Sequence, residues 1–246
     1  MLVNSPTPTL DQLVLDGKVA GEWPSALRAV DPAIDIRVDR CLSKVSRFSP
    51  YVPVPGRVWR VYEMPPQEVR VVIIGQDPYP NPSLATGLAF STGPRGPISD
   101  SLTYIFDELK SAGLQLPTYG DLSRWADQGV FLLNRALTLP QASAAGPRVH
   151  FGVWAPVLRA TLRVIAVEGK RRPVAALLWG AKARHLRQYL EPEVRIFTSS
   201  HPSPKSAKYD DGVVDPFVGS RPFTKVNKWL AAQDPPAPLV DWALVP

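Results

Sequence analysis

The chain has 246 residues, 45% of them hydrophobic and 20% charged, which is enough to bury one sizeable core, and we expect a single domain over residues 1–246. One cysteine excludes an internal disulfide and any metal site built on several thiolates, and three scattered histidines show no ligand spacing. The net charge is +6, and the excess of basic residues is partly clustered in GKRRP (169–173) and AKARHLR (181–187). This charge is compatible with a polyanionic partner and equally with a basic surface that only confers solubility.

The N-terminal sequence, MLVNSPTPTLDQLVLDG, has no basic region followed by an apolar run, and no stretch of the chain reaches the roughly 18 apolar residues of a membrane span. We therefore expect a cytoplasmic protein with no membrane partner. Residues 1–50 are expected to form an N-terminal extension with a helical part. Proline makes up 28 of 246 residues, and its clusters near the N-terminus, in SPYVPVPG and in the tail DPPAPLVDWALVP predict extended, irregular segments.

Four short runs rich in valine, isoleucine and leucine predict strands that are covered on both faces, because they are apolar on nearly every residue rather than on alternate ones. The runs are VRVVIIG (69–75), GVFLLN (129–134), PVAALLWG (173–180) and VRIFTSS (194–200). Helical patterns cover 101–112, with Asp100 as a candidate N-cap, 153–168, 181–190 and 222–232, with a short turn near 122–128. The order predicts an α/β fold: three α/β/α layers around a four-stranded parallel sheet.

Polar residues follow the predicted strands, at the sheet edge where ligands of such folds bind. The first strand runs into GQDPYP, the second ends on Asn134, and the last two run into WGAKA and SSHPSPKS. Each residue has a structural alternative: Asp77 as a turn former, His201 as a surface histidine, Asn134 as a cap and Phe90 as a core residue. Tyr79 is different, because prolines on both sides stiffen its backbone and fix where the ring points. The convergence of these residues favours a functional site.

The motifs GQDPYP, GLAFS, GVFLLN, LLWG, HPSP and GSRPF occur in the order and approximate spacing of family 1 uracil-DNA glycosylases. The chain resembles that family from about Tyr51 to Trp242, most specifically in GQDPY and HPSP, so residues 51–242 would be the family-like core. The resemblance implies a monofunctional enzyme that flips uracil out of single- or double-stranded DNA, hydrolyses its N-glycosidic bond and leaves an abasic site, without metal or cofactor. It also implies a monomer, with a proteinaceous uracil-DNA glycosylase inhibitor as a further candidate partner.

The resemblance implies a role for each site residue. Asp77 would activate the attacking water and offset positive charge on the sugar, and His201, as a neutral donor, would stabilise the departing uracil anion at O2. Asn134 would read the uracil O4 and N3–H edge, Phe90 would stack under the base, and Tyr79 would block the 5-methyl of thymine.

The residues that resemble the DNA-contacting loops depart more from the family. Gln76 would place a backbone N–H near uracil O2, and the candidate DNA contacts are Pro80, Ser101, Gly180, Ser203, Lys205 and Ser206. The departures are Pro80 for a common histidine, Ala181 for a serine, Ser99 and Asp100 for two prolines, a displaced His150, Lys205 for a leucine wedge, and extra residues in 207–216.

These departures leave a second class of function open, a non-catalytic or attenuated DNA-binding protein on the same scaffold. The altered loops favour that alternative, whereas the intact Asp77, Asn134 and His201 oppose it. A glycosylase with a shifted preference, for example for single strands, lies between the two. At Lys205 we hypothesise that an electrostatic contact with DNA replaces the insertion of an apolar wedge into the base stack, and that the extra segment inserts beside it. The alternative is a lysine that points into solvent.

Overall fold

A four-stranded parallel sheet forms the centre of the protein, whose computed structural model describes residues 7–47, 50–141, 149–210 and 212–244. Its strands are β2 (Val71–Gly75), β3 (Val130–Asn134), β5 (Ala175–Trp179) and β6 (Arg195–Ser199), in the order β3-β2-β5-β6. Every residue of β2, β3 and β5 is buried, which explains why these runs are apolar throughout. The four predicted strands and their parallel arrangement are confirmed, each one or two residues shorter at its ends.

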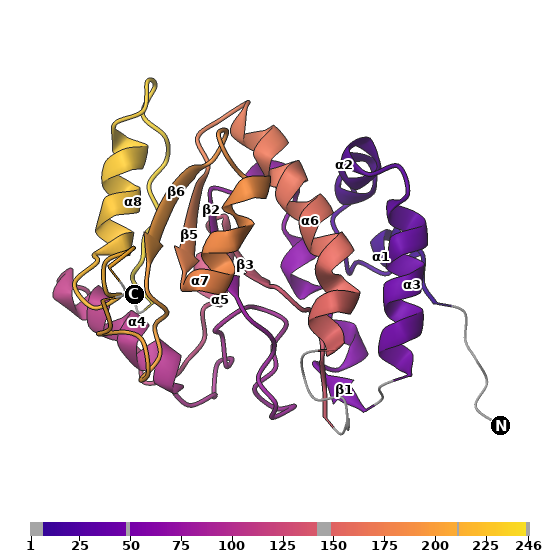
Figure 1. The fold of residues 1–246 in the computed structure, drawn as a ribbon, viewed down its shortest axis with the longest axis horizontal. Coiled ribbons are helices and arrows are strands. Elements are labelled where there is room, and N and C mark those ends of the chain that lie inside the picture. Colours follow the sequence, from indigo (N-terminus) through magenta and orange to yellow (C-terminus); the bar gives the residue numbers. More distant parts are fainter. Residues whose placement is uncertain (1–6, 48–49, 142–148, 211, 245–246) are drawn as a thin grey trace.

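Helices cover both faces of the sheet in three α/β/α layers, as predicted (Figure 1). On one side, α4 (Asp100–Ser111) packs against α8 (Pro222–Ala231). On the other side lies α6 (Val149–Gly169), which packs in turn against α2 (Trp23–Val30) and α3 (Ile34–Ser46). Among the residues that the structure describes, no helix combines the length and apolarity needed to cross a membrane.

The segment before the sheet is more helical than its prolines suggested. Besides α2 and α3 it contains α1 (Leu10–Leu15), so the helical part expected within residues 1–50 is present, and the expectation of an extended, irregular N-terminal part is wrong there. Pro24 is compatible with α2 because it lies in the first turn of the helix, where the backbone N–H has no hydrogen-bond partner within the helix. Trp23 is fully buried in the same hydrophobic cluster as the strands of the sheet.

The other proline-rich segments differ from each other. In SPYVPVPG, β1 (Tyr51–Val52) pairs antiparallel with β4 (Leu139–Pro140), a small sheet that the sequence did not predict. Three short 3-10 helices then lead into β2, namely Pro55–Arg57, Arg60–Glu63 and Pro66–Glu68. The tail after α8 forms neither helix nor strand as far as residue 244, in agreement with its composition.

The predicted helices hold with three corrections. The helix predicted at 153–168 begins at Val149, and the pattern over 181–190 divides into α7 (Ala181–Arg184) and a 3-10 helix (His185–Tyr189). The short turn near 122–128 is α5 (Ser123–Ala126). The N-cap of α4 is Ser99 rather than Asp100, because Ser99 is the last residue with an extended backbone and its Oγ accepts the N–H of Leu102.

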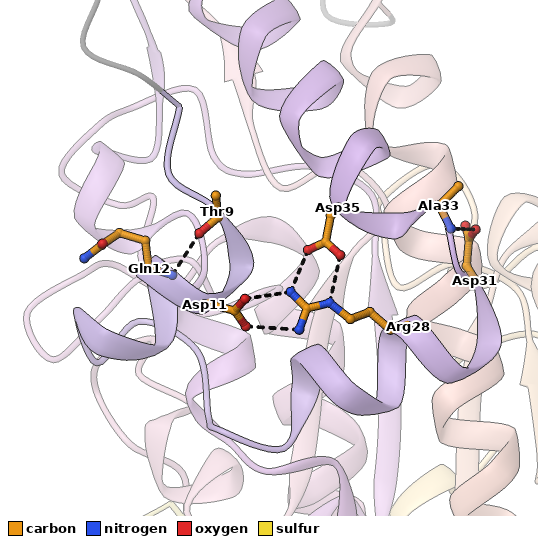
Figure 2. A network of polar contacts seen from close by, with 7 residues as sticks. All are labelled: Thr9, Asp11, Gln12, Arg28, Asp31, Ala33 and Asp35. Carbon is orange, nitrogen blue, oxygen red and sulfur yellow. Dashed lines mark hydrogen bonds and ion pairs between the residues drawn. The ribbon is translucent and has the colours of Figure 1, made fainter.

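One arginine joins the three N-terminal helices (Figure 2). Arg28 on α2 donates two hydrogen bonds to Asp35 of α3, at 2.8 and 2.9 Å, and two to Asp11 of α1, at 3.1 and 2.8 Å. The three side chains are 39% to 65% exposed, so water and salt screen the charges, and each pair contributes at most about 1 kcal/mol. The Arg28 hydrogen bond also holds the pKa of Asp35 below its ordinary value of 3.8.

We expect Arg28→Met to lower the free energy of unfolding at pH 7 by up to about 1 kcal/mol for each of the two lost pairs. A carboxylate with a lowered pKa stabilises the fold above its unfolded pKa and loses that contribution as the pH falls through its folded pKa. The loss should therefore shrink below about pH 3.8. Urea unfolding across pH measures it, with Arg37→Met, which removes one pair with Asp31, as the control. Equal losses in both variants would contradict the expectation.

Candidate active site

A cavity of about 240 Å³ opens where β2 and β3 end. It is lined by all six residues predicted to catalyse or to bind the base and by two of those predicted to contact DNA, namely Gln76, Asp77, Tyr79, Pro80, Phe90, Ser101, Asn134 and His201. These residues are separated by up to 125 positions in the sequence, and the parallel sheet brings them together because it aligns the carboxyl ends of its strands.

A second, wider groove of about 480 Å³ shares Gln76 and His201 with this cavity. It contains three of the four remaining predicted DNA contacts, Gly180, Ser203 and Ser206. Lys205 is exposed on the turn that follows and lines neither the cavity nor the groove. Tyr209, in the extra segment after Lys205, also lines the groove, and this residue is 63% exposed.

Asn134 is held at the end of β3 by the pairing with β2. Gly75 and Asn134 are register partners, and the ladder continues beyond the strands through hydrogen bonds from Arg135 N to the Gly75 carbonyl (3.1 Å) and from Ala136 N to the Gln76 carbonyl (3.2 Å). A Cβ at position 75 would lie 2.8 Å from the Ala89 Cβ and closer still to Asn134 Oδ1. Glycine is therefore required for the amide to occupy this place, where it is 5% exposed.

Phe90 stands at the cavity in a backbone conformation that is uncommon for a bulky residue, with φ at 65°. Its ring lies 5.6 Å from the ring of Trp179 and 6.2 Å from that of His201. Its carbonyl oxygen accepts a hydrogen bond from the Tyr79 hydroxyl at 2.8 Å. Strain of this kind persists only where the surroundings hold it, and it is typical of sites that position a ligand.

His201 is fixed by close contact with the turn after β5 and by its own loop. Gly180, with φ at 83°, passes so close that a Cβ there would lie 3.0 Å from the His201 Cβ. The carbonyl of His201 accepts the N–H of Ser203 at 2.8 Å, and the Ser200 hydroxyl bonds to Ser206 O and Phe217 N at 2.7 and 2.9 Å. The loop therefore carries His201 on a hydrogen-bonded frame.

The electrostatics of the cavity shift its acid and its histidine in opposite directions. Burial raises the pKa of Asp77 above its ordinary value of 3.8, and the Gln76 side chain, Lys182 and Arg135 oppose this rise. Burial also lowers the pKa of His201 below 6.5, and the positive charge of Lys182 lowers it further. The imidazole is therefore mostly neutral at pH 7 and can donate from a ring nitrogen without carrying charge.

Three basic residues that were not among the predicted site residues also line the groove, Arg135, Lys182 and Arg184. Lys182 and Arg184 belong to the basic cluster AKARHLR (181–187) that suggested a polyanionic partner, whereas Arg135 was missed. Lys182 Nζ lies 3.3 Å from Gln76 Oε1, and the Arg135 guanidinium lies 5.2 Å from the centre of the Phe151 ring. Their positions in the sequence could have indicated a role at the site. Arg135 follows Asn134 directly and Lys182 lies two residues after Gly180, so both lie just beyond the end of a strand. Together they make the groove a candidate site for phosphate.

His150, whose role the sequence left open, lies outside both cavities. It is buried in α6, with Nδ1 2.8 Å from Thr138 Oγ1, and the same hydroxyl accepts the indole N–H of Trp154. Burial lowers the pKa of His150 below 6.5. Among the described residues, no group of three or more His, Cys, Asp or Glu side chains is placed to hold a metal ion.

Comparison with known proteins identifies the family. The profile of the "Uracil DNA glycosylase superfamily" matches residues 61–231, which is more than half of the chain. The chain belongs to this superfamily. The family resemblance expected from the motifs is thus confirmed.

Relatives and solved structures of the superfamily cover nearly the whole chain. Uracil-DNA glycosylase of Nocardioides sp. is 40% identical over 236 residues, 94% of this chain and 96% of its own, and uracil-DNA glycosylase 1 of Streptomyces avermitilis is 40% identical over 92% of this chain and 96% of its own. The crystal structure of mimivirus uracil-DNA glycosylase superposes with a TM-score of 0.77 at 26% identity, covering 98% of this chain and 95% of that one. A variant of the mimivirus protein was crystallised in complex with UGI.

We expect Lys182→Met to raise the pKa of His201 toward 6.5, because a nearby positive charge is removed while the burial stays. The pKa of Asp77 should rise as well. NMR titration of the histidine side chains measures the first shift, with His201→Gln to assign the signal. Lys228→Met, which removes one charge from an exposed site that lines neither cavity, is the control. A wild-type His201 pKa at or above 6.5 would overturn this account of the cavity.

Proposed function

We propose that this protein removes uracil from DNA by hydrolysing its N-glycosidic bond, which releases free uracil and leaves an abasic site. One observation carries the proposal: in a chain of the uracil-DNA glycosylase superfamily, an acid, an amide and a histidine from three strand ends line one cavity. Relatives named uracil-DNA glycosylase match more than 90% of the chain. The comparisons offer no support for the non-catalytic alternative.

Asp77 is the residue that we assign to the attacking water. The bond between the sugar C1′ and uracil N1 breaks with its electron pair leaving on uracil, and positive charge grows on the sugar. The Asp77 carboxylate offsets that charge and accepts a proton as water adds to C1′. Pro78 and Pro80 near this acid restrict the backbone, so the carboxylate is held in place before substrate arrives.

His201 is the residue that we assign to the departing base. As a neutral imidazole it donates a hydrogen bond to uracil O2 while negative charge develops there, a contribution worth about 2.7 to 4 kcal/mol for a preorganised donor. The lowered pKa of His201 supports this role, because a neutral ring still has one N–H to donate. The backbone N–H of Gln76 would be a second donor near O2.

The remaining residues of the cavity would select the base. The Asn134 amide both donates and accepts, which matches uracil O4 and N3–H and opposes the reversed pattern of cytosine. Phe90 would stack on the base, and Tyr79 would occupy the space of a 5-methyl group. A uracil that is stacked and paired inside a duplex cannot enter a cavity of about 240 Å³ in the protein, so we also propose that uracil is flipped into it, at an unpairing cost of a few kcal/mol.

The groove beside the cavity would hold the DNA backbone. Ser203 and Ser206 offer hydroxyl groups and Gly180 a close backbone approach, and we add Lys182 as a cation for a phosphate. Pro80 and Ser101 would contact the strand at the mouth of the uracil cavity. The hypothesis of electrostatic grip at Lys205 stays a prediction, and its exposed position is compatible with a phosphate contact as well as with solvent.

Several properties stay predictions for this chain. They are a monomeric state, a cytoplasmic location and inhibition by a protein of the kind that was crystallised with the mimivirus protein. The preferred strand context belongs with them, since either single- or double-stranded DNA would present a uracil to the cavity.

We expect Asp77→Asn and His201→Leu each to lower kcat by about 100-fold or more, because each removes an interaction that strengthens in the transition state. Release of uracil from an oligonucleotide, followed by alkaline cleavage at the abasic site, measures turnover. Binding of the same oligonucleotide and the melting temperature should change little. Near-normal turnover in either variant would refute the assigned roles. If the wild-type protein binds the oligonucleotide without cleaving it, the proposed glycosylase activity is refuted.

We expect base selection to change at two positions. Tyr79→Ala should admit thymine, because it empties the space beside the 5-position, and Asn134→Asp should admit cytosine, because it alters the hydrogen-bonding edge. Oligonucleotides that contain thymine or cytosine at one position measure both effects by the same cleavage assay. If both variants continue to refuse these bases while they still release uracil, the cavity is not the base pocket.

A further inference from the structure

The Tyr79 hydroxyl belongs to a continuous chain of hydrogen bonds between α4 and Phe90. It donates to the Phe90 carbonyl oxygen at 2.8 Å and lies 2.8 Å from Ser99 Oγ. Because a phenol has a single proton and the Phe90 carbonyl accepts it, Ser99 must donate the proton of the second bond. Ser99 Oγ in turn accepts the N–H of Leu102 at 3.3 Å. All hydrogen bonds of this network are therefore donated in the same direction, from the Leu102 N–H through Ser99 and Tyr79 to the Phe90 carbonyl.

Both ends of this chain are anchored in rigid parts of the fold. At one end, α4 buries five of its twelve residues, Leu102, Ile105, Phe106, Glu108 and Leu109. At the other end, Phe90 has φ at 65°, a conformation that persists in a bulky residue only where the surrounding structure holds it. Between them the Tyr79 ring is fixed twice, at its Cα by two flanking prolines and at its hydroxyl by Ser99 and Phe90.

We propose that Ser99 is a positioning residue for base selection, which holds the Tyr79 ring where a substituent at C5 of a bound pyrimidine would lie. This rests on the proposed function of the cavity. A ring that is fixed at both ends cannot swing aside, so a 5-substituent collides with it. A ring that loses the Ser99 bond keeps at its hydroxyl only the bond to the Phe90 carbonyl, so it can rotate more easily about its side-chain bonds and make room. Ser99 therefore controls how strictly 5-substituted bases are refused, without contacting the base.

The experiment compares release of uracil and of 5-bromouracil, whose bromine is close in size to a methyl group, from single-stranded oligonucleotides. The readout is the ratio of kcat/KM for the two bases. We expect Ser99→Ala to lower this selectivity ratio by up to about tenfold, the effect of one neutral hydrogen bond. Tyr79→Phe removes the same bond together with the bond to the Phe90 carbonyl, so it should lower the ratio at least as much, and adding Ser99→Ala to it should lower the ratio no further.

Three comparisons separate positioning from a general loss of structure. Tyr79→Phe leaves the Ser99 cap of α4 intact, so a shared phenotype cannot come from the lost cap. Thr9→Ala removes an equivalent cap, the bond from Gln12 N to Thr9 Oγ1, far along the chain in α1 and should leave the ratio unchanged. Ser99→Thr keeps the hydroxyl and should retain the wild-type ratio.

An unchanged ratio in Ser99→Ala, or additive effects in the double variant, would overturn the positioning role while uracil release continues. A wild-type protein that releases no uracil would instead refute the proposed function, and with it this inference. The two failures are thus distinguishable in the same assay.

Discussion

The parallel pairing of β2 with β3 on one side and β5 on the other is the constraint on which the site depends. It aligns Gly75 with Asn134 and extends beyond the strands through hydrogen bonds from Arg135 N to the Gly75 carbonyl and from Ala136 N to the Gln76 carbonyl. Without that register, Asp77 on the loop after β2 and the amide at the end of β3 would not face one cavity. The apolar residues that bury the sheet on both faces therefore also determine where the polar residues meet.

Rigidity around the cavity comes from residues that restrict the backbone. Prolines flank Tyr79, Gly75 permits the approach of Asn134, and Phe90, which has a left-handed conformation, accepts a hydrogen bond from Tyr79. Each feature reduces the reorganisation needed when substrate binds, and displacement of a reacting group by about 1 Å can cost on the order of 100-fold in rate. Strain and stiffness are concentrated where geometry matters most for the proposed chemistry.

One charged neighbour, Lys182, shifts the pKa of both the acid and the histidine of the cavity. Burial pushes the Asp77 carboxyl and the His201 imidazole toward their neutral forms, and Lys182 favours the ionised acid while it disfavours the protonated histidine. The same lysine lies in the groove with Arg135 and Arg184. The basic groove can thus attract a polyanion and also set the protonation states of the cavity.

The sequence by itself determined the fold class, the four strands and the residues that would meet, because doubly covered strands are apolar on every residue and the polar residues after them end at one edge. Local pattern also supported α4 and α8. Three outcomes were decided only in the tertiary structure: Ser99 rather than Asp100 caps α4, β1 pairs with β4, and α1 to α3 form in a proline-containing segment. The cations at Asp77 and the tether of Tyr79 to Ser99 belong there too, because they join residues 20 or more positions apart, and no local pattern records which side chains will touch.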